Sequence, residues 1–201
     1  MKLVIEINQD PLEAVIQAVQ GIYARKDPAH DLGHALRVRE WGKQISAKEG
    51  ADSLIVELAA ILHDIGRSGT VARTHAESSS ALASGILQKG GYSNSVIERV
   101  KEAILSHSRE GYEPETLEAR ILYDADKLDF VGPMGMARLF AWAGKEGKAF
   151  FGPHSAEEFY HERVCHYHEY LYTQTARDFF EPLFRFSEDF WSELERARLK
   201  I

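Results

Sequence analysis

The stretch ADSLIVELAAILHDIG, residues 51–66, decides the fold class because its central part is apolar on every side. Glu57 is the only charged residue between Asp52 and Asp64, and a helix without a polar face is buried inside a protein. His63 and Asp64 then lie at the buried carboxyl end of that helix, where the last carbonyl groups disfavour a negative charge. Burying an unpaired carboxylate costs on the order of several kcal/mol, so we expect a cationic side chain or a metal ion beside Asp64.

Around this buried helix the sequence predicts further helices. Apolar residues recur with a period of about 3.6 along the chain, whereas the alternation typical of strands is nearly absent. Because there is no internal repeat or low-complexity linker, we expect a single all-α domain, a helical bundle over residues 1–201. Its sequence motifs lie at about 30–140, and long helices at about 155–172 and 174–198 are expected to pack on that region. The other predicted helices cover 11–26, 34–50, 75–91, 95–108, 114–132 and 134–144.

Composition limits the partners that this chain can have. The net charge is −7, from 24 basic and 31 acidic residues, which argues against binding a nucleic-acid polymer or a membrane surface. No apolar run approaches the ~18 residues that a membrane span needs. The single cysteine, Cys165, excludes an intrachain disulfide, and we expect a cytoplasmic protein.

Histidines and carboxylates at four places along the chain could carry chemistry. These are His34, the pair His63-Asp64, His107, and the run YDADKLD at residues 123–129. Imidazole nitrogens and carboxylate oxygens are the ligands of borderline and hard divalent metals. Each residue alone is weak evidence, because a lone helical histidine more often belongs to a core or a surface. Within the run, periodicity does not choose between Asp124 and Asp126, which lie on opposite sides of the apolar stripe.

The same set, in this order and with its flanking residues, resembles the HD superfamily of metal-dependent phosphohydrolases. The resemblance covers roughly residues 30–140 and rests on the phrases HALRV, ILHDIGR, AILSHS and ILYDADKLDFVGPMGMAR. It is strongest with small bacterial HD-domain hydrolases thought to act on nucleotides. The resemblance implies that one divalent ion, which could be manganese, magnesium, cobalt, nickel, iron or zinc, is held by His34, His63, Asp64 and Asp126.

Residues next to these ligands are expected to meet the substrate. Arg67 follows Asp64 by three positions and Lys127 follows Asp126 directly, so both cations could contact a phosphate. Their alternative interpretation is that of solvated charges at helix ends. Asp129 is expected beside the substrate as an acceptor that orients a ligand or Lys127, although a helix-end carboxylate bonded to the backbone or to an arginine fits equally well.

Two further histidines leave the number of metal ions open. Some members of the superfamily hold two ions with ligands in the order that this chain could supply with His75 and His107. The gap between Asp64 and His75 is short for that pattern, so a second metal stays an alternative. We expect His75 and His107, together with Asp64, to act as catalytic acid–base or phosphate-binding groups.

The C-terminal helices are rich in aromatic residues, which favours a core stripe and leaves open a homodimer face or the wall of a base-stacking pocket. The leading hypothesis is a metal-dependent phosphohydrolase that uses a metal-activated water to cleave a phosphate ester or anhydride. Its substrate is expected to be a small phosphorylated molecule, in particular a nucleotide. The alternatives are an HD-type diiron oxygenase and a regulatory binding domain whose metal site is structural.

Overall fold

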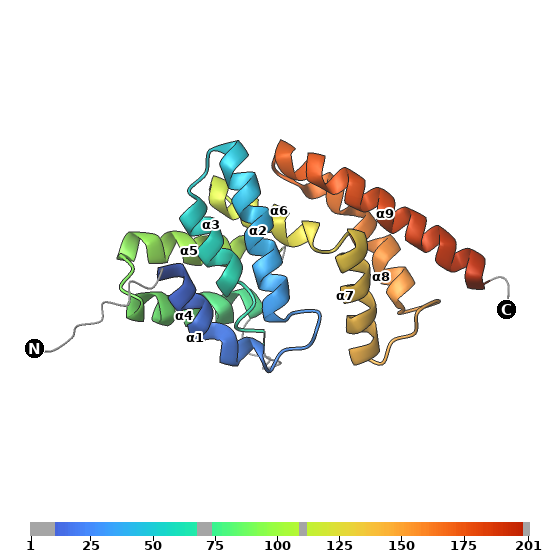
Figure 1. Ribbon diagram of the computed structural model, residues 1–201, viewed down its shortest axis with the longest axis horizontal. Coiled ribbons are helices and arrows are strands. Elements are labelled where there is room, and N and C mark those ends of the chain that lie inside the picture. Colours follow the sequence, from blue (N-terminus) through green and yellow to red (C-terminus); the bar gives the residue numbers. More distant parts are fainter. Residues whose placement is uncertain (1–10, 68–73, 109–111, 199–201) are drawn as a thin grey trace, which may run out of the picture.

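Helices account for the regular structure throughout the chain (Figure 1). The computed structural model describes residues 11–67, 74–108 and 112–198, and no strand occurs in these ranges. The prediction of an all-α protein is confirmed. The elements are α1 (Pro11–Tyr23), α2 (Leu32–Glu49), α3 (Ser53–Leu62), α4 (His75–Lys89), α5 (Asn94–Ser106), α6 (Leu117–Leu128), α7 (Gly132–Lys145), α8 (Ala156–Glu162), the 3-10 helix η1 (Val164–Tyr170) and α9 (Gln174–Arg198).

The apolar helix α3 lies at the centre of the bundle formed by α1 to α6. It contacts α2, α5 and α6, and every residue from Leu58 to Leu62 is fully buried. Because the second half of α3 is covered on all sides, residues at its carboxyl end are held in fixed positions with little access to water. The pair His63-Asp64 follows α3 directly, and both residues are 1% exposed.

Two caps determine where the helices around this centre begin. The side chain of Asp31 accepts a hydrogen bond from the backbone amide of His34 and caps α2. Thr74 caps α4 in the same way and forms a reciprocal capping box with Glu77. Such caps satisfy amides that a helix leaves unpaired in its first turn. His34 and His75 therefore occupy first-turn positions that are set by local hydrogen bonds.

The long helix predicted at 155–172 is divided in the structure, so that prediction is wrong in its extent. α8 ends at Glu162, Arg163 leaves the helical region with φ −131° and ψ −58°, and the chain continues as η1. Residues 163–170 are rich in histidine, tyrosine and a β-branched valine, which have moderate helix propensities and do not oppose this change. After the break, η1 contacts α8 and α9, and the Tyr167 ring packs against Phe130.

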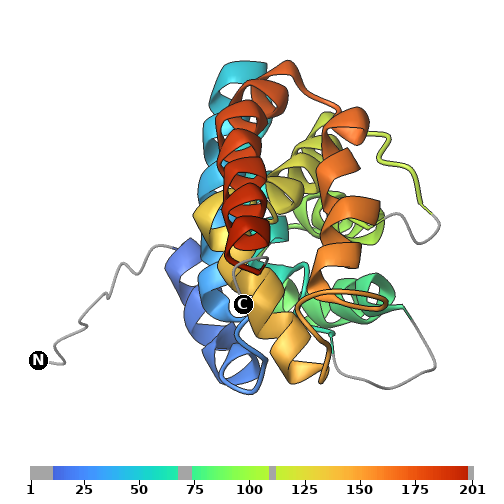
Figure 2. The ribbon, with the colours of Figure 1, turned by 90° about the vertical axis from the view of Figure 1, so that its right-hand side faces the viewer.

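Asp124 of α6 ties the C-terminal elements to this bundle. Its buried carboxylate accepts hydrogen bonds from the backbone amides of Tyr172 and Thr173, each at 2.8 Å, and from the Thr173 hydroxyl at 2.7 Å. Helix α9 starts directly after these residues and contacts α2, α6 and α7 (Figure 2). The C-terminal elements are thus anchored to the helix that also carries the YDADKLD run.

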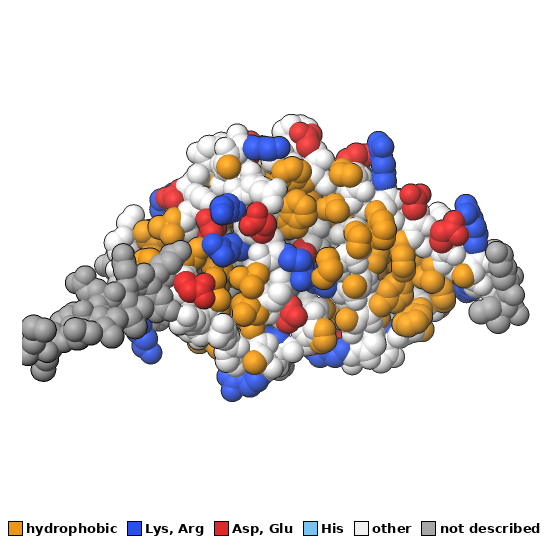
Figure 3. All heavy atoms as spheres, viewed as in Figure 1, with side chains coloured by type: hydrophobic (Ala, Val, Ile, Leu, Met, Phe, Trp, Pro, Cys, Tyr) orange, Lys and Arg blue, Asp and Glu red, His pale blue; other side chains and the backbone are white. Residues whose placement is uncertain are grey.

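Hydrophobic side chains gather over the half of the molecule formed by α7 and α9 (Figure 3). From α7 onward the large hydrophobic residues with more than a third of their surface exposed are Met134, Phe150, Tyr170, Tyr172 and Phe186. A homodimer through this half remains a prediction that a measurement of molecular mass in solution would check. Among the described helices, none has both the length and the apolar character that crossing a bilayer requires.

Candidate metal centre and active site

Four predicted ligands from three elements meet at the carboxyl end of α3. The Nε2 atoms of His34 and His63 lie 3.2 Å apart, and Oδ1 of Asp126 lies 3.4 Å from the first and 3.9 Å from the second. Oδ2 of Asp64 lies 3.7 Å from His63 Nε2 and 4.0 Å from His34 Nε2. The two imidazole nitrogens thus lie near one oxygen of each carboxylate, although the four residues are up to ninety-two positions apart in the chain.

The far side of each imidazole ring is held by an acceptor, which fixes the tautomer. Nδ1 of His34 lies 2.8 Å from Oδ2 of Asp129, and Nδ1 of His63 lies 2.8 Å from the Ala60 carbonyl oxygen. A nitrogen that faces an acceptor carries the proton, so each Nε2 presents a lone pair toward the centre. This arrangement is the one that histidine ligands of metals adopt.

The chemistry of these four atoms fits a divalent cation. Lone pairs that face one another at 3.2 Å repel unless a proton or a cation lies between them. Neighbouring ligands about 2.1 Å from an octahedral ion are separated by about 3 Å, close to the shorter distances here. His34, His63, Asp64 and Asp126 are the residues that would hold the ion.

A second group shares Asp64 with the first. Nε2 of His75 lies 3.1 Å from Nε2 of His107, and Oδ1 of Asp64 lies 3.9 Å from His75 and 4.0 Å from His107. Nδ1 of His107 faces the Ile104 carbonyl oxygen at 2.5 Å, so its Nε2 also presents a lone pair. Asp64 therefore directs one oxygen to each group, and Asp64, His75 and His107 could hold a second ion.

Burial sets the protonation of this centre. It lowers the pKa of His63, and it lowers the pKa of His107 to about 3, with the charge of His63 acting in the same direction. For Asp64, burial raises the pKa, but His63 and Arg67 outweigh it and hold that pKa well below its ordinary value. For His34, burial and Arg138 lower the pKa, and the carboxylates of Asp126 and Asp129 outweigh them. A neutral His107 is suited to ligating a metal through its lone pair, and its low pKa makes it a weak proton acceptor.

The structure places the three carboxylates of the YDADKLD run in three different environments. Asp126 joins the first ligand group, whereas Asp124 faces the Tyr172–Thr173 segment on the other side of α6. Asp129 lies behind His34 and accepts hydrogen bonds from Arg37 at 2.8 and 3.0 Å, with the guanidinium of Arg138 3.1 Å away. Both oxygens of Asp129 are engaged in this way, so its geometry is that of a residue that orients a ligand.

Gly66 permits the close packing that brings His75 to this centre. A Cβ atom on Gly66 would lie 2.3 Å from the backbone nitrogen of Ser79 in α4, a distance that no side chain can occupy. The Gly66 amide also donates a 2.9 Å hydrogen bond to the Ser79 hydroxyl. Because α4 begins at His75, the contact between Gly66 and Ser79 determines how closely His75 approaches Asp64.

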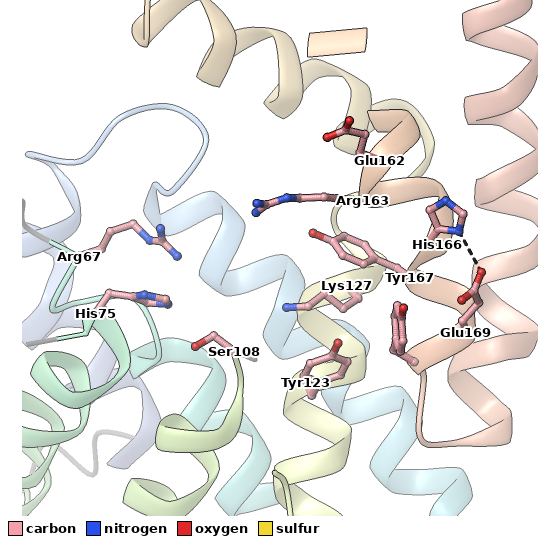
Figure 4. A pocket seen from close by; sticks show the side chains of 11 residues that line it. Arg67, His75, Ser108, Tyr123, Lys127, Glu162, Arg163, His166, Tyr167 and Glu169 are labelled. Carbon is pink, nitrogen blue, oxygen red and sulfur yellow. Dashed lines mark hydrogen bonds and ion pairs between the residues drawn. The ribbon is translucent and has the colours of Figure 1, made fainter. Parts of the chain in front are cut away.

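A cavity of about 730 Å³ opens beside the second histidine group (Figure 4). Arg67, His75 and Lys127 point into it from the α1–α6 bundle, and Arg163 points into it from the break between α8 and η1. Lys127 also lies 2.6 Å from Oδ2 of Asp126, and Arg67 Nε lies 3.2 Å from Oδ1 of Asp64. The other lining residues are Ser108, Tyr123, Glu162, His166, Tyr167, Glu169 and Tyr170.

Several lining residues were not singled out from the sequence, among them Arg163, Tyr123 and Ser108. Arg163 comes from a segment distant from the motifs, Tyr123 opens the YDADKLD run, and Ser108 follows His107. Only the position of Ser108, next to a predicted site histidine, could have suggested it. Nothing in the local pattern of Arg163 distinguishes it from other arginines on the C-terminal helices.

A family model matches the part of the chain that carries these residues. The model of the HD domain matches residues 31–131, about half of the chain. The chain belongs to the HD-domain family. Residues 31–131 include all six ligand candidates of this HD-domain protein together with Arg67, Lys127 and Asp129.

Known proteins resemble the chain over nearly its whole length. It is 29% identical over 182 residues to the uncharacterized protein YpgQ of Bacillus subtilis, which covers 89% of each chain. The crystal structure of YpgQ in complex with ADP superimposes with a TM-score of 0.80, 26% identity, and 93% and 94% coverage. A predicted HD superfamily hydrolase from an uncultured Thermotogales bacterium is 30% identical, with a TM-score of 0.71 and 98% and 99% coverage. Membership of this HD family supports a metal-dependent hydrolase and leaves its substrate undetermined.

Proposed function

We propose that this HD-domain protein is a metal-dependent phosphohydrolase that cleaves a phosphate ester or anhydride of a nucleotide. The proposal rests on one observation: the predicted metal ligands lie next to a cavity that is lined by cationic side chains. His75 belongs to the second ligand group and also lines the cavity. Arg67 and Lys127 line the cavity too, and each contacts a carboxylate that is a predicted ligand. A phosphate in the cavity would therefore lie next to the metal centre.

The side chains of this chain supply binding and orientation. Phosphoryl transfer needs mainly positioning and stabilisation of charge on the phosphate oxygens, which Arg67, Lys127 and Arg163 would provide. A divalent ion at the centre would lower the pKa of a water molecule and draw charge from the phosphoryl group. Asp129 would hold the His34 ring, and the Ala60 carbonyl would hold the His63 ring, so that neither has to reorganise during the reaction.

Two observations favour a nucleotide as the substrate. The relative YpgQ, which has the same fold, was crystallised in complex with ADP. The volume of about 730 Å³ also falls within the range of roughly 300–1,000 Å³ that ligands of this size occupy.

The six-residue ligand set also favours a second candidate, an HD-type diiron oxygenase. Both histidine groups and the shared Asp64 are present, so two irons could be held. The cations around the cavity favour a phosphorylated substrate over an uncharged one. Iron analysis combined with measurement of oxygen consumption separates the two candidates. Two irons per chain together with substrate-dependent oxygen uptake would refute the hydrolase and support the oxygenase.

The proposal is tested by a screen of nucleoside mono-, di- and triphosphates with manganese, magnesium, cobalt, nickel, iron and zinc. We expect phosphate or pyrophosphate release that EDTA abolishes and that Asp126→Ala lowers at least about 100-fold, because the variant lacks a ligand. Glu181→Ala, which removes an exposed carboxylate on α9, is the matched control and should retain full activity. Activity that survives Asp126→Ala would refute the assignment of that ligand.

A further inference from the structure

A second, smaller cavity adjoins the first and shares Arg67 and Arg163 with it. Its volume is about 230 Å³, and its other lining residues are Ala29, His30, Phe130, Arg138, Leu139, Trp142 and Phe159. This volume is below the roughly 300–1,000 Å³ that whole drug-sized ligands occupy, so it has room for one ring system and not for a complete nucleotide.

Flat groups dominate the lining of the smaller cavity. The rings of Trp142 and Phe159 are in contact, with centroids 4.7 Å apart. The guanidinium of Arg138 lies 4.7 Å from the Phe130 ring, and that of Arg163 lies 5.5 Å from the Phe159 ring. Aromatic rings and guanidinium planes are the surfaces on which nucleobases stack. No carboxylate is among the described residues that line this cavity.

The lining of the larger cavity is different, although it contains three tyrosines. The ammonium of Lys127 lies 4.6 Å from the Tyr123 ring and 5.8 Å from the Tyr167 ring, so these two rings border a cation that a phosphate could contact. The edge of Tyr167 also packs against Phe130, with centroids 5.5 Å apart. Lys127, His75 and the hydroxyl of Ser108 are donors of the kind that phosphate oxygens accept. Two carboxylates, Glu162 and Glu169, also line the larger cavity, but His75 joins that cavity to the second ligand group, so the reacting phosphate is expected there.

We propose that the base of the nucleotide substrate binds in the smaller cavity against Trp142 and Phe159, while its phosphates lie in the larger one. Arg67 and Arg163 stand at the border of the two cavities, where the sugar and the first phosphate would pass. Figure 4 shows their side chains extending toward one another from opposite walls. Within the described chain Arg163 has no carboxylate partner, so its charge is available to a phosphate. This inference rests on the proposed function and adds to it the position of the base.

Two ligands that differ only by a nucleoside test the proposal. Adenosine 5′-(α,β-methylene)diphosphate and methylenediphosphonate share a bridge that is not hydrolysed, so calorimetry measures binding without turnover. We expect Trp142→Ala to weaken binding of the adenosine compound by about 5- to 100-fold, the range for loss of one stacked base, and to leave methylenediphosphonate within about twofold. Trp142→Phe, which keeps an aromatic ring, should restore most of the affinity.

Matched variants separate the outcomes. Phe186→Ala removes an exposed aromatic ring on α9 outside both cavities and should change neither affinity, and thermal unfolding of each variant checks its folding. Equal weakening of both ligands by Trp142→Ala would overturn the proposal, as would selective weakening of the adenosine compound by Tyr170→Ala, because the base would then lie in the larger cavity. The proposed function can fail separately: the wild type would then hydrolyse no nucleotide, while Trp142→Ala would still weaken binding of the adenosine compound and not of methylenediphosphonate.

Discussion

Oδ1 of Asp64 lies 3.9 Å from Nε2 of His75, which lines the cavity, while the other oxygen of Asp64 faces His63 and His34. One carboxylate therefore serves two histidine pairs. Asp64 follows the buried helix α3, so its position is fixed, and His75 reaches it only because α4 begins at that residue. The number of ions that the protein binds depends on this relationship.

With both ligand groups occupied, His75→Ala should lower the metal content of the protein from two ions per chain to one. The variant removes a ligand from the second group and leaves His34, His63 and Asp126 in place. Elemental analysis after desalting measures the stoichiometry. His154→Asn removes an exposed histidine whose φ of 59° asparagine tolerates, so it should bind the same number of ions as the wild type. A variant His75→Ala that still binds two ions would show that His75 is not a ligand.

Asp129→Asn should weaken metal binding by about 10- to 100-fold, because the amide is a weaker acceptor for the Nδ1 proton of His34 than the carboxylate. Activity at saturating metal should recover most of its wild-type value, since Asp129 positions a ligand and does not line the cavity. Metal titration measures the affinity. Glu57→Gln removes the charge from a comparable arginine–carboxylate pair, Arg39–Glu57 at 2.7 Å, and should leave metal binding unchanged.

Gly66→Ala should destabilise the protein by about 1–3 kcal/mol and reduce occupancy of the second metal group, because the new methyl group would push α4 and His75 away. Gly85→Ala within α4 is the matched control. A Cβ atom there meets nothing within 4 Å, so alanine should stabilise the helix by up to about 1 kcal/mol. Chemical denaturation gives both free energies of unfolding, and equal effects of the two substitutions would contradict the close packing at Gly66.

Arg163→Ala should raise the KM for a nucleotide by about 10- to 100-fold and change kcat only a few-fold, because a charge-assisted hydrogen bond contributes roughly 1.5–3 kcal/mol. Arg163→Lys should recover part of this loss. Arg185→Ala, which removes an arginine paired with Glu181 on the surface of α9, should leave both constants unchanged. Steady-state kinetics measures the effect, and an unchanged KM in Arg163→Ala would exclude Arg163 from substrate binding.

The stability of the metal-free protein should fall as the pH is lowered from about 6.5 toward 3. Burial lowers the pKa of His107 to about 3, whereas in the unfolded chain a histidine has a pKa of about 6.5. Between these values the unfolded chain binds a proton that the folded protein does not, so acid favours unfolding. Denaturation at pH 7, 6 and 5 should show a weaker pH dependence for His107→Asn than for the wild type, and equal slopes would contradict this role of His107.

The sequence by itself determined the class of fold and the types of residue that carry the chemistry. A helix apolar on all sides has to be buried, and a carboxylate at its carboxyl end needs a compensating cation, so residues 51–66 already indicated a cationic side chain or a metal ion beside Asp64. The recurring helical period excluded a sheet because the spacing of apolar residues depends only on local geometry. These conclusions follow from interactions between residues close together in the chain.

Only the tertiary structure decided which residues meet. Asp124 and Asp126 are alike in sequence, but α6 turns one toward Thr173 and the other toward His34. Arg163 reaches the cavity because α8 ends before it. Arg163 and Arg67 are far apart in the sequence, so the sequence does not show that both line the same cavity. His75 comes within reach of Asp64 because Gly66 lets α4 pack closely. Such contacts depend on how helices are oriented against one another, and no local pattern of residues specifies that.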